Sequence, residues 1–194
     1  MGRRYCGRER RKHMAERVEK VRLTSRNREG VRALYTAAFQ KKDRMPFSLM
    51  CLMACLPNTE FLCFYDGDTL CGFVYLAKMG NIVFLMFLAV DEKLRSRGLG
   101  SRILAHVGRM YPGKKLVVSF ERCGVTAADL EERRRRRKFY LENGYGASGY
   151  LIRLGAAEQE LAVKNGEIRR WELRWFFLVY SCFTLWPRIW RADG

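Results

Sequence analysis

One stretch, from Asn81 to Met110, constrains the fold of this chain more than any other. It opens with an unbroken apolar run from Ile82 to Val90, which has the length of a buried strand and is far too short to span a bilayer. A charged segment then leads into Gly98-Leu99-Gly100. Beyond it, apolar residues recur at the spacing of one helix face: Leu99, Ile103, Leu104, Val107 and Met110. The stretch predicts a strand, a glycine turn and a helix.

The glycine turn is a candidate phosphate site. The first N–H groups of a helix lack intrahelical partners and lie at the positive end of its dipole. Gly98 and Gly100 would let the backbone approach a diphosphate, and Arg95, Arg97 and Arg102 add positive charge. For the four residues Arg97 to Gly100 taken alone, a plain turn between strand and helix is the simpler interpretation.

Length and charge limit the class of protein. The 194 residues suffice for one domain of ordinary size that needs no disulfide or metal to hold it together. The formal net charge of +17 is concentrated in the Arg-rich N-terminal segment and in the run from Arg133 to Lys138. Such an excess attracts nucleic acid, anionic lipid or a phosphorylated cofactor, and a merely solvated basic surface is equally open.

The cysteines indicate a reducing, cytoplasmic environment. All 7 are scattered along the chain without a CxxC pair, which favours free thiols. Cys51 and Cys55 lie one helical turn apart, but with only His13 and His106 elsewhere we expect no metal site and place both cysteines in the core. We expect no membrane span either, because the longest later apolar stretch, Trp175 to Trp186, is too short.

The remaining segments predict a mixed α/β (α+β) chain. We expect a basic, disordered leader over residues 1–14, a domain over 15–165 and an aromatic C-terminal helix packed on it over 166–194. Further helices are expected over 31–39, capped by Thr24 or Ser25, over Phe47 to Leu56 and over Thr126 to Asn143. Further strands are expected over Val18 to Leu23, Phe61 to Tyr65, Leu70 to Lys78, Leu116 to Phe120, Tyr145 to Leu154 and Glu158 to Val163, with a hairpin turn at Asp66-Gly67-Asp68.

Two motifs in this order carry a family resemblance: Arg95-x-x-Gly98-x-Gly100, and Phe139-Tyr140 followed by Gly144-Tyr145. Together they resemble the GNAT superfamily of acyl-CoA-dependent N-acyltransferases. The first matches the superfamily's [Arg/Gln]-x-x-Gly-x-[Gly/Ala] signature, whose backbone amides grip the cofactor's pyrophosphate. The second matches its late helix and turn, where a tyrosine commonly protonates the departing thiolate. The resemblance extends over Val18 to Val163.

The resemblance implies a mostly antiparallel central sheet of six to seven strands flanked by helices. Its fourth and fifth strands, here Ile82 to Val90 and Leu116 to Phe120, would splay apart to hold the pantetheine arm of acetyl-CoA. The backbone N–H of Val90 would polarise the thioester carbonyl. Cofactor contacts are expected from Leu88, Ala89, Val90, Arg95, Ser96, Arg97, Gly98, Leu99, Gly100 and Ser101.

Two side chains are candidates for proton transfer. Tyr140 is the expected general acid, because a phenol with a pKa of about 10 is matched to an alkyl thiolate; a core tyrosine is the alternative. Glu121 ends the strand that faces the expected site and could take the proton of the amine, directly or through water. A carboxylate is a weak base unless burial raises its pKa, so a structural Glu121 is equally open.

One segment departs from the family pattern. Many relatives carry an asparagine soon after the fifth strand, and none occurs between Arg122 and Lys138. Cofactor contacts are therefore not carried over to this segment. We expect the run from Arg133 to Lys138 to form a solvated helix face, with the 3′-phosphate of the cofactor as the alternative partner.

The expected function is acetyl transfer from acetyl-CoA to a primary amine. The alternatives are a non-catalytic module that binds acyl-CoA or nucleic acid, and membrane association through the aromatic C-terminal helix. The segment Gln40 to Asn58 should border the acceptor, and it carries Lys41, Lys42 and Arg44 against Asp43 as its one acid. That balance favours a neutral or anionic amine over a polyamine. A homodimer is common in the family and stays open.

Overall fold

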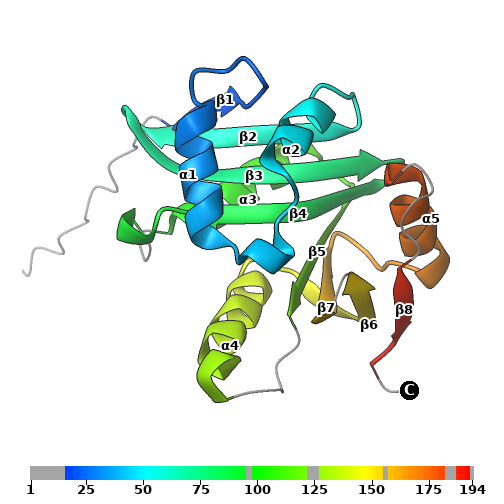
Figure 1. Cartoon of the computed structure of the whole chain (residues 1–194). Coiled ribbons are helices and arrows are strands. Elements are labelled where there is room, and N and C mark those ends of the chain that lie inside the picture. The colour runs from blue at the N-terminus through cyan, green and yellow to red at the C-terminus, as the bar shows by residue number, and fades with distance from the viewer. Residues whose placement is uncertain (1–15, 95–97, 122–126, 155–156, 182–186, 193–194) are drawn as a thin grey trace, which may run out of the picture.

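The computed structural model describes residues 16–94, 98–121, 127–154, 157–181 and 187–192 as one sheet with helices on both faces (Figure 1). The strands are β1 (Glu16–Lys20), β2 (Thr59–Asp66), β3 (Thr69–Met79), β4 (Ile82–Val90), β5 (Lys115–Glu121), β6 (Gly146–Leu154), β7 (Ala157–Lys164) and β8 (Arg188–Arg191). The helices are α1 (Arg28–Ala38), α2 (Phe47–Met53), α3 (Leu99–Met110), α4 (Ala127–Glu142) and α5 (Arg170–Tyr180), with short 3-10 turns η1 (Lys41–Asp43) and η2 (Glu92–Leu94).

The sheet consists of two antiparallel halves joined by one parallel pair. Its strand order is β1-β2-β3-β4-β5-β7-β6-β8. The first four strands pair antiparallel in chain order, and the hairpin between β2 and β3 turns at Gly67 with φ 59°, as the sequence predicts. Strands β4 and β5 are parallel and pair from Ile82–Lys115 to Leu85–Val118. Beyond that point they separate, which confirms the expected splay.

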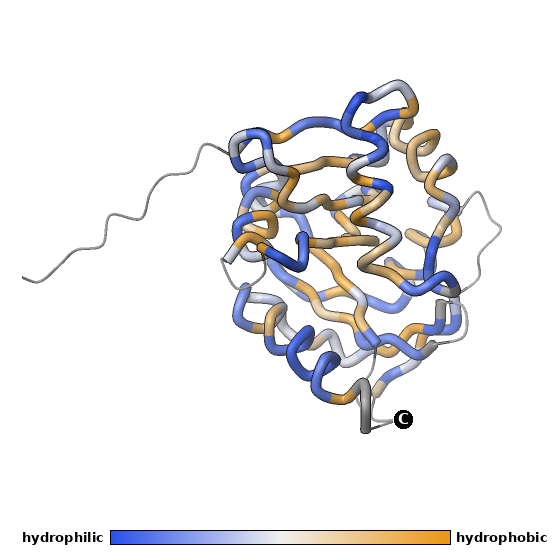
Figure 2. The backbone as a smooth tube through the Cα atoms, turned by 60° about the vertical axis from the view of Figure 1, so that its left-hand side comes forward, coloured by the Kyte–Doolittle hydropathy of each residue, from blue (hydrophilic) through white to orange (hydrophobic). Residues whose placement is uncertain are grey.

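The helices bury their apolar faces against opposite sides of the sheet. One side carries α3 and the end of α4, where Ile103, Leu104 and Tyr140 pack on strand residues. The other side carries α1 and α2 in front of the first four strands, and α5 packs on β3 and β4 near their ends and next to β8 (Figure 1). Figure 2 shows the apolar strands between these layers and the hydrophilic α4 beside them. The sheet is therefore covered on both faces, as expected.

Several expectations need correction. The sheet has eight strands rather than six to seven, because Arg188–Arg191 pairs with β6 as β8; four residues with arginine at both ends give no period-two signal. Thus 166–194 is more than a helix. Strand β1 begins at Glu16, α1 follows Asn27 instead of Thr24 or Ser25, and α2 ends at Met53.

The expectations for the cysteines are confirmed for one residue and wrong for another, and the expectation for the leader stays untested. Cys51 is buried, whereas Cys55 is exposed, since α2 ends before reaching it. Within the described residues, no cluster of His, Cys, Asp or Glu could hold a metal ion. None of the described helices is both long and apolar enough to span a membrane. The leader over residues 1–14 lies outside the described residues, so its disorder stays a prediction.

Candidate functional site

A groove opens where β4 and β5 separate. Past Leu85, β4 pairs with β3 but no longer with β5, while Ser119 and the rest of β5 pair with β7. The cavity between them has a volume of about 590 Å³. It is lined by Ala38, Phe39, Leu85, Met86, Leu88, Ala89, Val90, Leu94, Gly98, Leu99, Gly100, Ser101, Val118, Ser119, Glu132, Arg135, Arg136, Lys138, Phe139, Tyr140 and Glu142. Its walls thus come from β4, β5, α3 and α4, with the end of α1 at one side.

A β-bulge sets which backbone groups of β4 face this groove. Tyr75 of β3 lies opposite Phe87 and the next residue of β3 lies opposite Leu85, so Met86 is the extra residue. Near the end of β4, the N–H of Asp91 donates to the carbonyl of Cys71 at 2.8 Å. Antiparallel strands alternate between hydrogen-bonded and non-bonded positions, so the N–H of Val90 points away from β3 and toward the gap. The N–H of Val90 is thereby directed toward the groove.

The N-terminus of α3 lies in the groove wall. Gly98 is its N-cap residue, with a left-handed φ of 71°, and has no side chain to accept from the first N–H groups. The first N–H of the helix with an intrahelical partner is that of Arg102, which donates to the carbonyl of Gly98 at 3.1 Å. The preceding residues Leu99, Gly100 and Ser101 line the cavity. Their N–H groups form the kind of helix start that binds anions.

Gly100 has a second role that the sequence did not indicate. A Cβ at this position would lie 3.0 Å from Cζ and 3.1 Å from Cε2 of Phe139. Only glycine therefore allows the ring of Phe139 to rest on the first turn of α3 without a shift. The same small residue keeps α3 and α4 together at the groove.

Tyr140 is held rigidly at the inner wall of the groove. Its ring stacks on Phe120 with a centroid distance of 5.4 Å and meets Phe139 and Tyr145 edge-on. The residue is 7% exposed and lines the cavity. Burial raises the pKa of Tyr140 to about 12, against an opposing effect of Arg136. The phenol is therefore fully protonated at neutral pH and able to donate.

Glu121 is not among the residues that line the groove. Its carboxylate forms an ion pair with Arg133 of α4, with 3.1 Å between Arg133 Nε and Glu121 Oε2. The side chains are 18% and 24% exposed for Arg133 and Glu121, so the pair is largely shielded from water. The polar residue that β5 does present to the groove is Ser119. In the sequence, Ser119 could have been noticed as the one hydroxyl residue within an otherwise apolar strand segment.

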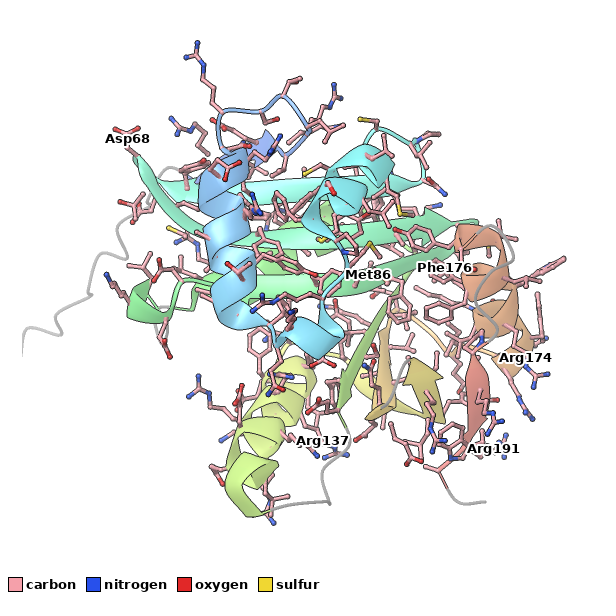
Figure 3. All side chains as sticks on the ribbon, in the orientation of Figure 1. Asp68, Met86, Arg137, Arg174, Phe176 and Arg191 are labelled. Carbon is pink, nitrogen blue, oxygen red and sulfur yellow. The ribbon has the colours of Figure 1, made fainter. Side chains whose placement is uncertain are left out.

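The arginine run of α4 divides by helix face. Arg133 and Arg137, one turn apart, bind carboxylates of the sheet: Glu121, and Glu160 at 3.3 Å (Figure 3 labels Arg137). Arg135, Arg136 and Lys138 instead line the groove. The expectation of a solvated helix face is thus wrong for Arg133 and Arg137, because helical periodicity alone does not say which neighbours each face meets.

Most of the expected cofactor residues come together here. Leu88, Ala89 and Val90 lie on one wall, and Gly98 to Ser101 lie at the end of it. Arg95, Ser96 and Arg97 lie outside the described residues, and their contacts stay predictions. The sequence did not single out Phe39 or Met86, because tertiary packing brings these residues to the site.

Comparisons with known proteins show a similarity to acetyltransferases over part of the chain. Residues 57–146 match the family described as acetyltransferase (GNAT) domain. The mycothiol acetyltransferase of Thermobispora bispora is 37% identical over 102 residues, which cover 48% of this chain and 32% of that protein. The chain therefore spans about a third of the length of this curated relative.

Solved structures share the fold at low identity. A protein from Bacteroides thetaiotaomicron assigned to the GNAT acetyltransferases has a TM-score of 0.69 at 16% identity, covering 87% of this chain and 99% of the other. The PaiA N-acetyltransferase of Thermoplasma acidophilum, solved in complex with coenzyme A, has a TM-score of 0.54 at 14% identity, covering 76% and 98%. At such identities the likeness concerns the fold.

Proposed function

We propose that this chain is an acetyltransferase of the GNAT superfamily and that it transfers an acetyl (acyl) group from acetyl-CoA to a primary amine by direct attack. The observation that carries the proposal is the groove between β4 and β5, which has the anion-binding start of α3 at one end and Tyr140 in its wall. A fold relative bound to coenzyme A supports acyl-CoA as the co-substrate.

The phosphate groups of the cofactor fit the charged part of the groove. The N–H groups at the start of α3 would bind the diphosphate, with Gly98 leaving the approach open. Arg136 and Lys138 are already paired along α4 with Glu132 and Glu142, at 3.0 and 3.8 Å. Arg135 makes no ion pair with any described residue, and we assign it to the 3′-phosphate.

The thioester would lie between the walls of the groove. The N–H of Val90 points into the gap, so it can donate to the carbonyl oxygen as negative charge develops there. The groove would hold amine and thioester in contact, and such positioning supplies about 7–11 kcal/mol in favourable cases. Most of the rate enhancement would then come from holding the amine next to the thioester carbon.

Proton transfer completes the reaction. The amine attacks the carbonyl carbon, the carbon–sulfur bond breaks and the thiolate of coenzyme A takes the proton of Tyr140. The tyrosinate is then reprotonated from water. For the proton lost by the amine we keep Glu121 as the candidate acceptor through water, because it follows Ser119 by two positions on β5 and so points to the same side of the strand. In this role Glu121 accepts the proton through water while its carboxylate stays paired with Arg133.

The acceptor end of the groove is apolar and adjoins a basic turn. Ala38, Phe39 and Met86 line it. The guanidinium of Arg44, which follows η1, donates to the carbonyl of Phe39 at 2.7 Å and so ties this basic turn to the groove. We propose a neutral or anionic amine as the acceptor. A clear turnover preference for spermidine in an amine panel would overturn this choice.

The proposal is tested by calorimetric titration with acetyl-CoA of the wild type and of Gly98→Asp. The matched control is Gly67→Asp: both glycines have a left-handed φ, 71° and 59°, and a Cβ at either would meet nothing within 4 Å. An aspartate at 98 sets a negative charge against the diphosphate, so we expect affinity to fall by about 100-fold or more there and to be unchanged in the control. Equal affinity in both variants would remove the phosphate site.

A second assay separates transfer from binding alone. Release of free coenzyme A in the presence of an amine is the expected result, with the rate saturating in both substrates. Tight binding of acetyl-CoA without release for any neutral, anionic or cationic amine would support the non-catalytic module. Failure to bind acetyl-CoA, with salt-sensitive binding of nucleic acid, would support the other alternative.

A further inference from the structure

Helix α5 is apolar on both of its faces. Its inner face buries Leu173, Phe176, Phe177 and Tyr180 against the sheet. Its outer face presents three further apolar side chains, Trp171, Trp175 and Val179, which are 59%, 52% and 42% exposed. These follow one another at intervals of four residues, so they form one stripe. We call Trp171, Trp175 and Val179 the α5 stripe.

Such a stripe is unusual on a surface. Single exposed apolar residues are normal, but three of them on successive turns of one helix form a continuous patch. Two tryptophans on successive turns expose a large apolar area together, and patches of this kind mark contact sites. The inner face of α5 already contributes to the core. The α5 stripe is therefore free to meet something outside the chain.

Unpaired arginines border the α5 stripe. Arg170 and Arg174 lie on α5, and Arg191 lies on the same face of β8 as Ile189, which packs with α5; none of these arginines forms an ion pair with another described residue. Figure 3 shows Arg174 and Arg191 on the same outer side of the molecule. The acid of α5, Glu172, is already engaged, since it accepts from Lys115 Nζ at 2.8 Å and from the N–H of Arg169 at 2.7 Å. The stripe thus has a positive border.

We propose that the α5 stripe and its arginines dock on an anionic membrane surface. Tryptophan settles at the headgroup level of a bilayer, because its ring is apolar and its N–H can meet water, and arginine is drawn to anionic lipids. The stripe lies on the outside of a helix and so forms a convex ridge, which suits a flat bilayer better than a single nucleic-acid strand, which is usually held in a groove. A second copy would bring the same positive charges face to face.

The test is flotation of the full-length protein with vesicles of phosphatidylcholine containing increasing fractions of phosphatidylglycerol. We expect binding to increase with phosphatidylglycerol and to weaken with salt. The double variant Trp171→Ser/Trp175→Ser should lower the bound fraction by about tenfold. The matched control, Leu52→Ser/Leu56→Ser, removes two side chains that are 56% and 48% exposed elsewhere, and should bind as the wild type does.

The N-terminal segment carries arginines of its own, so attraction to anionic vesicles is not sufficient support. The tryptophan variant separates the two sources of binding. If the wild type and Trp171→Ser/Trp175→Ser show the same vesicle-bound fraction, the proposal is overturned. A second pair addresses charge. Arg170→Gln/Arg191→Gln should weaken binding severalfold, whereas Arg134→Gln, an exposed arginine of α4, should not.

Two further measurements exclude other occupants. Light scattering should give the same mass for the wild type and the tryptophan variant; a dimer lost in the variant would assign the stripe to a second copy and overturn the proposal. Tryptophan-dependent binding of single-stranded RNA without vesicle binding would overturn it as well. Unchanged affinity for acetyl-CoA in every variant is the folding control, because the groove lies away from α5.

Discussion

Helices α3 and α4 line the same groove on the same side of the sheet, but they are held there by different forces. Helix α3 buries Leu99, Ile103, Leu104 and Val107. Among its described side chains, α4 buries Tyr140 fully and Phe139 in part, and otherwise relies on the ion pairs of Arg133 and Arg137 with the sheet. Partly exposed ion pairs contribute little free energy, whereas buried apolar side chains contribute much. Helix α3 is fixed by its buried apolar side chains, so the backbone N–H groups at its start can be held in place for a ligand. Helix α4 is anchored mainly by Phe139 and Tyr140 near its C-terminus, so its remaining side chains can face the groove.

The largest expected effect is on the chemistry that α4 supplies. Tyr140→Phe removes the proton donor and keeps the ring, so turnover should fall by about 100-fold or more with little change in acetyl-CoA affinity. Steady-state kinetics and calorimetry check this. Tyr145→Phe is the control: its hydroxyl is buried without a hydrogen-bond partner among the described residues, so its loss should cost neither turnover nor stability. Equal turnover in both variants would remove Tyr140 from the mechanism.

The next effect concerns the burial that holds α3. Ile103 is 1% exposed, and Ile103→Ala should lower the free energy of unfolding by about 2–5 kcal/mol through the cavity it leaves. Urea denaturation measures it. Met110→Ala on the same helix, where the side chain is 38% exposed, should cost less than about 1 kcal/mol. If the two losses were equal, the contrast between a buried α3 and a polar α4 would be wrong.

A smaller effect is expected where the two helices touch. Gly100→Ala places a Cβ against the ring of Phe139, and overpacking of this kind costs about 1–3 kcal/mol. Gly108→Ala, also in α3, meets nothing within 4 Å and should instead stabilise the helix by about 0.5–1 kcal/mol. Thermal denaturation of both variants gives the sign of each change. Stabilisation by Gly100→Ala would show that Phe139 moves aside freely.

The charges of α4 should affect cofactor affinity more than stability. Arg135 lines the groove, so Arg135→Gln should reduce the preference for coenzyme A over dephospho-coenzyme A by about tenfold. Its neighbour Arg134 is exposed and does not line the groove, so Arg134→Gln should keep that preference. Competition titrations with the two ligands measure it. An unchanged preference in Arg135→Gln would place the 3′-phosphate elsewhere.

The smallest expected effect is that of alkaline pH on turnover, which should not change between about pH 8 and pH 10. Burial, opposed by Arg136, raises the pKa of Tyr140 to about 12 from a usual value of about 10. The donor form is the protonated one, which persists below the raised pKa, so turnover should not decline between about pH 8 and pH 10. A pH–rate profile at saturating substrates tests this. A decline in that window that disappears in Tyr140→Phe would show that the phenol ionises near its usual pKa.

Much of the groove could be predicted because its parts are continuous in sequence. The strand Ile82–Val90 and the helix that starts after Gly98 occur where the apolar run and the helical periodicity place them. The misses share one cause. Strand β8 pairs with β6 although β7 and α5 lie between them in the chain, and Arg133 meets Glu121 only once α4 lies on the sheet. Neither contact leaves a local pattern in the residues that make it.

The sequence by itself determined the glycine turn, the amphipathic α3 and the buried strand before it, since each follows from the backbone freedom or apolar spacing of neighbouring residues. The tertiary structure alone decided which backbone groups and charges face the groove. The bulge at Met86 sets the direction of the Val90 N–H, and the docking of α4 divides its arginines between sheet and groove. Both depend on register and packing between segments far apart in the chain, which local sequence patterns do not specify.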